Sequence, residues 1–370
     1  MARAAIAPAA TAAPAPVSPN GWPVWGHDGA VADLRRAVDT DRVGHAFLVS
    51  GPDGVGKAAL ALAFARTLCC GDDSRSDRGV PCGVCLGCRK VGRGVHPDVQ
   101  TFGLASQAAA SEKSGGKNLT MTIDTARLIR AATTLRPTEA RWRVVIVNDA
   151  ETLQETAQEA LLKTLEEPAS FVVLLLLAND GDLLLPTIRS RCRPIELRPV
   201  PLDVVEVSLV AAGVDAAVAA EVAGLAGGRP GWARRAVADP RLLGERRAAL
   251  ERALAWIAGS PYDRLVAAVR LGDGFTKRRE PVFADLDALL GVWRDALLLH
   301  AALPHYLTYR GIAEQLTELA RGWDLAALHG AVRAVQTCIA DLEANVRPRL
   351  ALEAMVLQWP TSPSTTLGRR

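Results

Sequence analysis

The stretch Ala46-Phe-Leu-Val-Ser-Gly-Pro-Asp-Gly-Val-Gly-Lys57 decides the fold of this chain. Its first five residues form an apolar run typical of a buried strand, and a helical pattern continues from Lys57 to Leu68. A Gly-rich turn joins them, and this order of strand, turn and helix is the context that a phosphate-binding loop requires. Backbone N–H groups of such a loop converge on phosphate oxygens, while the lysine adds a positive charge. The candidate phosphate-contacting residues are Gly51, Gly54, Gly56 and Lys57.

Two positions beside this loop that normally hold Mg²⁺ carry other side chains. The residue after the lysine should offer a hydroxyl group, but it is Ala58. The carboxylate expected after the β-branched run 144–147 is replaced by Asn148, whose neutral amide is a poor ligand for a hard cation. Asp149 comes one residue later, where strand alternation directs its side chain elsewhere. The sequence therefore predicts a phosphate cradle without an efficient hydrolytic site, in which bound ATP would not be hydrolysed.

The rest of the chain alternates strands with helices and then becomes entirely helical. Short apolar runs predict strands at 144–147, 171–178 and 194–197. A helix is predicted over Glu151–Glu167, where Leu and Ala recur every four residues. This alternation indicates an α/β domain over 24–199, built on a doubly wound parallel sheet. Only helical patterns follow, which predicts a small helical unit over 200–240 and an all-α domain over 241–360.

Cys82, Cys85 and Cys88 have the spacing of metal ligands. A closed tetrahedral zinc site needs a fourth ligand, and Cys69, Cys70 or His96 could supply it, with a cysteine favoured. No position would then remain open for water, so the zinc would be structural, within a module over about 69–96. Seven cysteines without an export signal favour a reducing compartment and a metal over disulfides.

Composition excludes several classes of protein. The chain has 43 Lys and Arg residues and 40 Asp and Glu residues. This net charge of +3 does not indicate that the protein surface as a whole binds nucleic acid. The longest apolar run, at 171–178, is far shorter than the roughly 20 residues that span a bilayer, so we expect no membrane association. The Ala/Pro-rich start, within a disordered leader over 1–23, lacks the apolar core of a secretory signal. We expect a cytoplasmic protein with a polar tail over 361–370.

Together these residues resemble subunits of the bacterial DNA polymerase III clamp loader, within the AAA+ superfamily and related to its gamma and tau subunits. The resemblance covers roughly residues 24–360. Besides the phosphate-binding loop and the Cys cluster, the segments that carry it are His45-Ala46, His96-Pro-Asp98, Ala160-Leu-Leu-Lys-Thr-Leu-Glu-Glu-Pro168, Ser190-Arg-Cys192 and Asn345-Val-Arg-Pro-Arg-Leu-Ala-Leu-Glu353.

The resemblance implies the delta prime type of subunit, a stator that does not hydrolyse ATP. Its motor relatives keep a hydroxyl at position 58, an Asp-Glu pair at 148–149 and an arginine where this chain has Gly231. The isolated chain would then catalyse nothing itself, although it would belong to the DNA-directed DNA polymerase III holoenzyme. The resemblance also favours Cys70 over Cys69 as the first zinc ligand, and implies that 200–240 is a lid and 241–360 an oligomerising collar.

The same resemblance implies a set of partners. The collar would join this chain with a delta subunit and gamma or tau motor copies in a hetero-oligomer at the replisome. That assembly would place the sliding clamp on primer–template DNA. Arg191 would act as an arginine finger, reaching the ATP of a neighbouring motor subunit.

Two other functions are compatible with these motifs. One is a short gamma/tau-like motor with a working ATPase, against which Ala58 and Asn148 argue. The other is a zinc-containing P-loop protein that binds nucleic acid outside any clamp loader, with a steep dependence on salt. The collar-like C-terminal segment argues against this second function.

Overall fold

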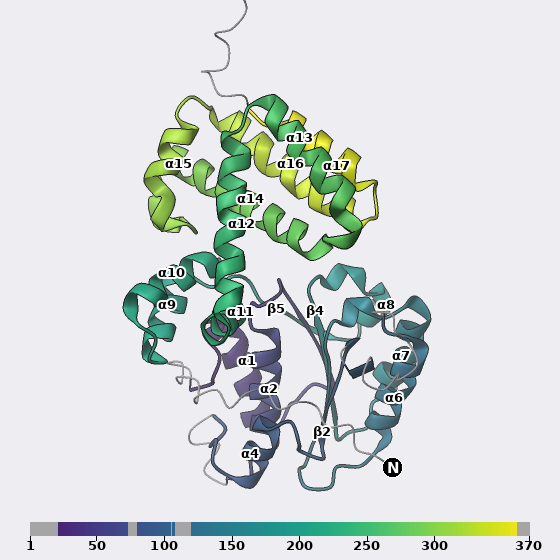
Figure 1. Ribbon diagram of the computed structural model, residues 1–370. Coiled ribbons are helices and arrows are strands. Elements are labelled where there is room, and N and C mark those ends of the chain that lie inside the picture. Colours follow the sequence, from purple (N-terminus) through teal and green to yellow (C-terminus); the bar gives the residue numbers. More distant parts are fainter. Residues whose placement is uncertain (1–20, 73–79, 105, 108–119, 361–370) are drawn as a thin grey trace, which may run out of the picture. The chain divides into compact units, whose positions relative to one another are not determined.

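The computed structural model describes residues 21–72, 80–104, 106–107 and 120–360, and contact clustering divides the chain into two compact units (Figure 1). The first unit includes residues up to 215 together with 228–232, and the second includes 216–227 and the residues from 233 onward. Most of the predicted leader, the polar tail and most of the Ser/Gly-rich stretch before Thr120 lie outside the described residues.

The first unit is built on a five-stranded parallel sheet in the order β2-β3-β4-β1-β5. Its strands are β1 (Ala46–Ser50), β2 (Val99–Phe102), β3 (Arg143–Val147), β4 (Val172–Ala178) and β5 (Arg193–Glu196). Its helices are α1 (Asp28–Asp39), α2 (Lys57–Leu68), α4 (Leu86–Gly92), α6 (Ile123–Thr134), α7 (Glu155–Glu166), α8 (Pro186–Arg189) and α9 (Leu202–Ala211), with 3-10 turns at Ala150–Thr152 and Gly181–Leu183.

Helices cover both faces of this sheet, because the three central strands are apolar on both sides. Helices α1 and α2 lie on one face and α6, α7 and α8 on the other (Figure 1). Neighbouring residues of one strand therefore enter different cores: Phe47 packs with α1 and α2, whereas Leu48 packs with the opposite layer. The predicted α/β fold with a parallel sheet is confirmed.

The predicted elements agree best with the structure next to the phosphate-binding loop, where β1 and α2 have the expected bounds. The helix expected from Glu151 begins only at Glu155, because a 3-10 turn over Ala150–Thr152 precedes it. Helix α1 and strand β2 were not predicted. Strand β2 lies at one edge of the sheet, and none of its residues is fully buried, so it lacks the apolar run that identified the other strands.

The second unit is helical. Its elements are α10 (Ala216–Ala226), α12 (Pro240–Ala258), α13 (Pro261–Gly274), α14 (Arg279–His300), α15 (Ala313–Ala320), α16 (Leu325–Glu343) and α17 (Pro348–Leu357), with 3-10 turns at Phe275–Lys277, Pro304–Tyr306 and Arg310–Ile312. Helix α11 (Pro230–Ala238) begins within the residues of the first unit and ends within those of the second. Glycine and proline residues lie at or near the ends of these helices, at Gly259–Pro261, Gly272–Gly274, Pro304 and Gly322.

An aromatic cluster forms part of the core of this helical unit. The ring centroids of Trp293 lie 5.1 Å from Trp323 and 5.5 Å from Trp359, and Trp359 lies 5.3 Å from Trp256. The guanidinium of buried Arg264 lies over Trp359 and donates to the carbonyl of Pro360 at 2.7 Å. The last described residues of the chain are thereby fixed to α13.

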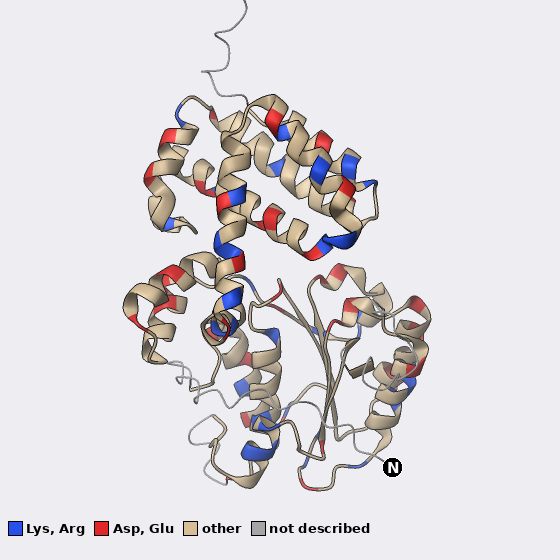
Figure 2. Ribbon diagram, viewed as in Figure 1, with Lys and Arg blue, Asp and Glu red and all other residues tan. Residues whose placement is uncertain are grey.

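Charge and hydropathy agree with the composition. Figure 2 shows acidic and basic residues interspersed over the helices of each unit. Within the described ranges, none of the helices is both long and apolar enough to cross a membrane.

Candidate nucleotide-binding loop and metal centre

The loop between β1 and α2 has the backbone shape of a phosphate-binding loop. Gly51, Gly54 and Gly56 have φ angles of 144°, 75° and 121°, which favour glycine strongly. A Cβ atom at Gly51 would also lie 2.1 Å from the carbonyl oxygen of Leu197, at the end of β5. The glycines are therefore required by the backbone of the loop itself, whether or not a phosphate is bound.

Lys57 is held by the chain's own oxygens. Its Nζ donates to the carbonyl of Gly51 at 2.5 Å, to that of Pro52 at 3.2 Å and to Oδ1 of Asn179 at 2.8 Å. Burial lowers the pKa of Lys57, an effect that the nearby carboxylates of Asp53, Glu151 and Asp149 oppose. The lysine thus has three oxygen partners of its own, with which a phosphate would compete.

Asn179 was missed by the sequence analysis. It directly follows β4, and the strand order places β4 between the strand that leads into the loop and β3. Carboxyl ends of parallel strands share one edge of a sheet, where ligands usually bind. The sequence does show that Asn179 is a polar residue directly after the longest apolar run. Its proximity to Lys57, however, depends on a strand order that the sequence did not reveal.

Other backbone oxygens of the loop are also engaged. The carbonyl of Gly54 accepts hydrogen bonds from the N–H groups of Gly231, at 2.7 Å, and Trp232, at 3.3 Å, in the first turn of α11. Nε2 of His27 lies 2.9 Å from the carbonyl oxygen of Val55. Burial is the largest influence on His27 and lowers its pKa, so the neutral ring is favoured.

The glycine at position 231 is required by the close approach of α11 to the loop. A Cβ atom there would lie 2.9 Å from the carbonyl oxygen of Gly54 and 3.5 Å from its Cα. In this arrangement residue 231 has no room for a side chain, at the position where the resemblance to the motor subunits led us to expect an arginine. The backbone N–H of residue 231 is instead bound to the loop.

The two altered metal positions lie where the sequence analysis placed them. Ala58 is in the first turn of α2, and Asn148 directly follows β3. Asp149 has a left-handed backbone, with φ of 52°, and its pKa is raised by burial, an effect that Lys57 opposes. Glu151, which the sequence analysis did not consider, accepts a hydrogen bond from the N–H of Asn179 at 3.0 Å. A positive charge and several acids therefore share this edge of the sheet.

Four cysteines form a separate cluster. The sulfur atoms of Cys70, Cys82, Cys85 and Cys88 all lie within 4.8 Å of one another, so the group could hold one metal ion. Backbone N–H groups point at these sulfurs: that of Cys85 lies 3.3 Å from Sγ of Cys82, and that of Cys88 lies 3.4 Å from Sγ of Cys85. Such donors stabilise thiolates, and four thiolates suit tetrahedral zinc.

The neighbouring Cys69 and His96 lie outside this cluster. Cys69 belongs to the apolar core beside α2, where burial raises the pKa of its thiol to about 12. Nδ1 of His96 accepts a hydrogen bond from the N–H of Asp98 at 3.1 Å. Cys85, which belongs to the cluster, differs from Cys69. Burial tends to raise the pKa of its thiol as well, but the N–H of Cys88 and other hydrogen bonds lower this pKa to about 7.

Gly87 allows the metal module to pack closely against α2. A Cβ atom at this position would lie 2.2 Å from the carbonyl oxygen of Cys69. This close contact requires glycine at position 87. At position 83 glycine is favoured for another reason, because the backbone has a φ of 75°.

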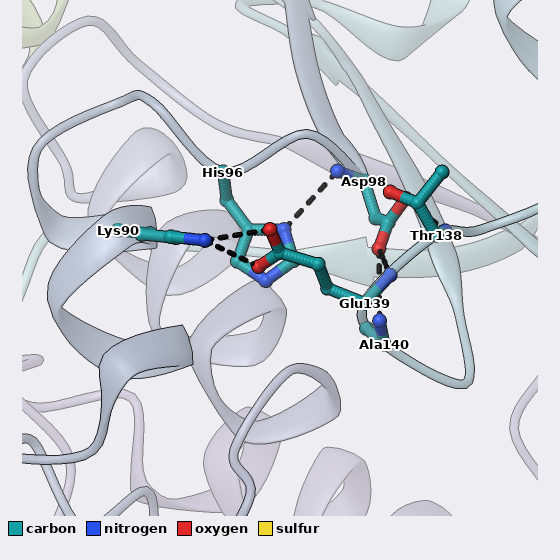
Figure 3. Close-up of polar contacts among 6 residues, drawn as sticks. All are labelled: Lys90, His96, Asp98, Thr138, Glu139 and Ala140. Carbon is teal, nitrogen blue, oxygen red and sulfur yellow. Dashed lines mark hydrogen bonds and ion pairs between the residues drawn. The ribbon is translucent and has the colours of Figure 1, made fainter.

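A polar network joins the metal module to the loop before β3 (Figure 3). Nζ of Lys90, on α4, lies 2.6 Å from both carboxylate oxygens of Glu139. The neighbouring N–H groups of Thr138, Glu139 and Ala140 all donate to the carboxylate of Asp98, at 2.7, 2.7 and 2.8 Å. Asp98 is fully buried, and Arg143, also buried, lies 3.6 Å from it.

Asp98 is accordingly a buried carboxylate whose negative charge is stabilised by the backbone N–H groups around it. Burial tends to raise its pKa, but the hydrogen bonds from Thr138, Ala140 and Glu139 lower it below the ordinary value. His96-Pro-Asp98 is one of the segments that carry the resemblance, but the sequence indicated no role for it. The structure shows that this segment orients the loop that leads into β3.

Arg191 lies between α8 and β5, at the surface of the first unit. Its side chain is 35% exposed, and its NH2 group lies 2.8 Å from Oε1 of Glu166. Its NH1 group donates to the carbonyl of Thr187 at 2.9 Å. Arg191 is not part of the loop that holds Lys57.

Comparison with family models links both ends of the chain to one replication complex. A family described as "DNA polymerase III, delta subunit" matches residues 26–201, and one described as "DNA polymerase III, delta subunit, C terminal" matches residues 243–361. The two matches together include most of the described residues of both units.

Sequence relatives with subunit names of DNA polymerase III agree with these matches. The delta' subunit of Pseudomonas aeruginosa is 33% identical over 66% of this chain and 61% of its own length. The delta' subunit of Escherichia coli is 36% identical over 46% and 48%, and the gamma/tau subunit of Mycobacterium tuberculosis is 33% identical over 48% and 28%. The chain thus spans less than two thirds of each of these relatives. A gamma subunit-related protein of Thermotoga maritima, 21% identical, superposes with a TM-score of 0.38 over 88% of this chain and 97% of its own.

Proposed function

The chain belongs to the DNA polymerase III delta' subunit family, and from that premise we propose that it is the stator of a clamp loader. In this role it would join motor subunits and a delta subunit in a hetero-oligomer, which places the sliding clamp on primer–template DNA at the replisome in the cytoplasm. The helical second unit would supply the collar, and the first unit would form one position of the ATPase ring.

One observation supports the stator role above the others: neither of the two positions beside the phosphate-binding loop that normally hold Mg²⁺ carries a metal-holding side chain. Ala58 offers no oxygen, Asn148 offers no charge, and the first turn of α11 donates to the loop at Gly54. A motor needs Mg²⁺ and a γ-phosphate sensor at these places. ATP could still bind through Lys57 and the loop amides, but rapid turnover is not expected.

Catalysis would take place at the neighbouring subunit. We propose that Arg191 reaches the γ-phosphate of ATP bound to an adjacent motor subunit. A guanidinium is always charged and can donate to two phosphate oxygens at once. In other phosphoryl-transfer systems such fingers raise the rate by on the order of 10³–10⁵.

The cysteine cluster would hold a structural zinc. Cys70, Cys82, Cys85 and Cys88 would provide four thiolates, leaving no ligand position for water. The chemistry of the zinc would be limited to fixing α4 beside α2, since nothing in a closed site of this kind activates a substrate.

The proposed function is tested by reconstitution with the gamma or tau and delta subunits of the same organism. We expect a stable hetero-oligomer that contains this chain and loads the clamp, and no loading when this chain is omitted. Failure to enter the assembly would contradict the proposal.

A gamma/tau-like motor remains the second candidate, because the gamma/tau subunit of Mycobacterium tuberculosis is 33% identical over 178 residues of this chain. It predicts ATP turnover by this chain alone at motor-like rates, abolished in Lys57→Ala. The stator predicts little turnover in either form.

A further inference from the structure

The guanidinium of Arg191 is folded back onto its own subunit. NH2 pairs with Glu166 at 2.8 Å, while NH1 donates to the carbonyl of Thr187 at 2.9 Å and lies 3.4 Å from Oγ of Ser190. Both terminal nitrogens are thus engaged by oxygens of the same chain. These are the nitrogens that a phosphate would need for a two-pronged contact.

The position of Glu166 strengthens this arrangement. Glu166 is the last residue of α7, where the unpaired helix carbonyls already make the surroundings negative. A carboxylate there is unfavourable for the helix alone, but it becomes favourable when a cation lies beside it. Arg191 is that cation, and it also binds the carbonyl of Thr187 in the short helix α8.

The flanking arginines do not share this arrangement. Arg189 pairs with Asp182, and for Arg193 the described residues provide no ion pair. Glu167, adjacent to Glu166, is exposed and likewise has no ion pair among the described residues. Of these three arginines, Arg191 alone pairs with an acid from α7 in the part of the chain that the structure describes, so the restraint is specific to the residue of the Ser-Arg-Cys segment.

We propose that Glu166 is a positioning residue that holds Arg191 against its own subunit until a nucleotide phosphate on the neighbouring subunit displaces it. This inference rests on the proposed arginine-finger role of Arg191. The carboxylate and the phosphate compete for the same N–H groups, so the arginine can engage only after it leaves Glu166. Glu166 would thereby make engagement depend on a correctly placed neighbour, and restrain ATP hydrolysis before clamp and DNA have bound.

The size of the effect follows from the exposure of the pair. The side chains of Arg191 and Glu166 are 35% and 48% exposed, and ion pairs of this kind bias an equilibrium only modestly. Removing the restraint should therefore raise the unstimulated ATPase of the assembly by about two- to fivefold. The rate with clamp and DNA should change little, because the phosphate already holds the arginine in that state.

The test compares Glu166→Gln with Glu167→Gln in the reconstituted clamp loader. Both variants remove one negative charge, at adjacent positions, and neither should alter thermal unfolding, because both side chains are exposed. We expect only Glu166→Gln to raise the unstimulated ATPase. In an Arg191→Ala background the same substitution should have no effect, because the residue that it restrains is absent.

A second measurement does not depend on ATP turnover. Phenylglyoxal modifies accessible guanidinium groups, and mass spectrometry of the full-length isolated chain can follow each arginine separately. Modification of Arg191 should be faster in Glu166→Gln than in the wild type, while that of Arg193 should stay constant.

The outcomes separate this inference from the proposed function. If Arg191→Ala leaves the stimulated ATPase and clamp loading at wild-type rates, the arginine-finger role is wrong and the inference fails with it. If Arg191→Ala slows loading but Glu166→Gln changes neither the unstimulated ATPase nor the modification rate, only the inference is wrong. A rise of equal size in Glu167→Gln, or in the Arg191→Ala background, would also overturn it.

Discussion

The missing side chain at Gly231 determines how the first turn of α11 meets the phosphate-binding loop. Its N–H donates to Gly54 at 2.7 Å, and a Cβ atom would approach the same oxygen to 2.9 Å. The loop is thereby fixed by contacts within the chain, which agrees with the proposed stator role.

Substituting Gly231→Ala should therefore destabilise the protein by about 1–3 kcal/mol, because backbone atoms must move apart to admit the methyl group. Urea unfolding followed by circular dichroism measures this change. The control is Gly244→Ala in α12, at an exposed site with no atom within 4 Å of the added methyl group. There we expect a gain of about 0.5–1 kcal/mol. Equal effects at both positions would disprove the close contact.

Asp98 provides a prediction with a defined dependence on pH. Its folded-state pKa is lowered by three backbone N–H groups, so its contribution to stability is complete above the unfolded value of about 3.9 and is lost as the pH falls through the folded value. Asp98→Asn should cost about 3 kcal/mol at pH 7, partly because Arg143 loses its buried counter-charge. The cost should be constant from about pH 5 to 8 and shrink below about pH 4.

Urea titrations across this pH range measure the difference between the two proteins. Asp124→Asn is the matched control, because Asp124 forms an exposed pair with Arg127 and is 77% exposed. Its cost should stay below about 1 kcal/mol. A cost for Asp98→Asn that persists undiminished in acid would mean that the carboxylate charge is not what the loop requires.

At the scale of elements, the sequence predicted what local pattern determines. The predicted bounds of β1 and α2 were right. An apolar run identifies the strand, and the Gly-rich turn marks where the strand ends and the helix begins. The edge strand β2 was missed, since its half-exposed residues have no apolar run. Among site residues, Lys57 and the cysteines follow from spacing, whereas Asn179 and His27 reach the loop only through tertiary packing. That packing depends on strand order, which local pattern does not encode.

The metal module allows a prediction that separates two adjacent cysteines. Purified protein should contain about one zinc per chain. Cys70→Ser should lose most of it, because the sulfur of Cys70 lies in the four-cysteine cluster, whereas Cys69→Ser should retain it, because Cys69 packs in the apolar core. Metal analysis by mass spectrometry after dialysis measures both. The opposite pattern would assign the fourth ligand to Cys69, and a folded wild-type protein without zinc would refute the structural metal.

At the scale of the whole molecule, the central question is whether the isolated chain turns over ATP. We expect steady-state hydrolysis near the background rate, because no side chain is placed to hold Mg²⁺ at positions 58 and 148. A coupled phosphate-release assay on the full-length chain measures this, with Lys57→Ala as the control for contaminating enzymes. Turnover at motor-like rates that disappears in Lys57→Ala would establish the motor alternative instead.

The aromatic cluster of the helical unit gives this protein a built-in optical label. Indole rings whose centroids lie 5.1–5.5 Å apart couple their electronic transitions, so Trp256, Trp293, Trp323 and Trp359 should produce a strong near-ultraviolet circular dichroism band. This band requires fixed packing of the rings, and it would vanish when that unit loosens even if its helices persist. The state of the helical unit can therefore be followed by its own absorption, without a dye and without altering a residue.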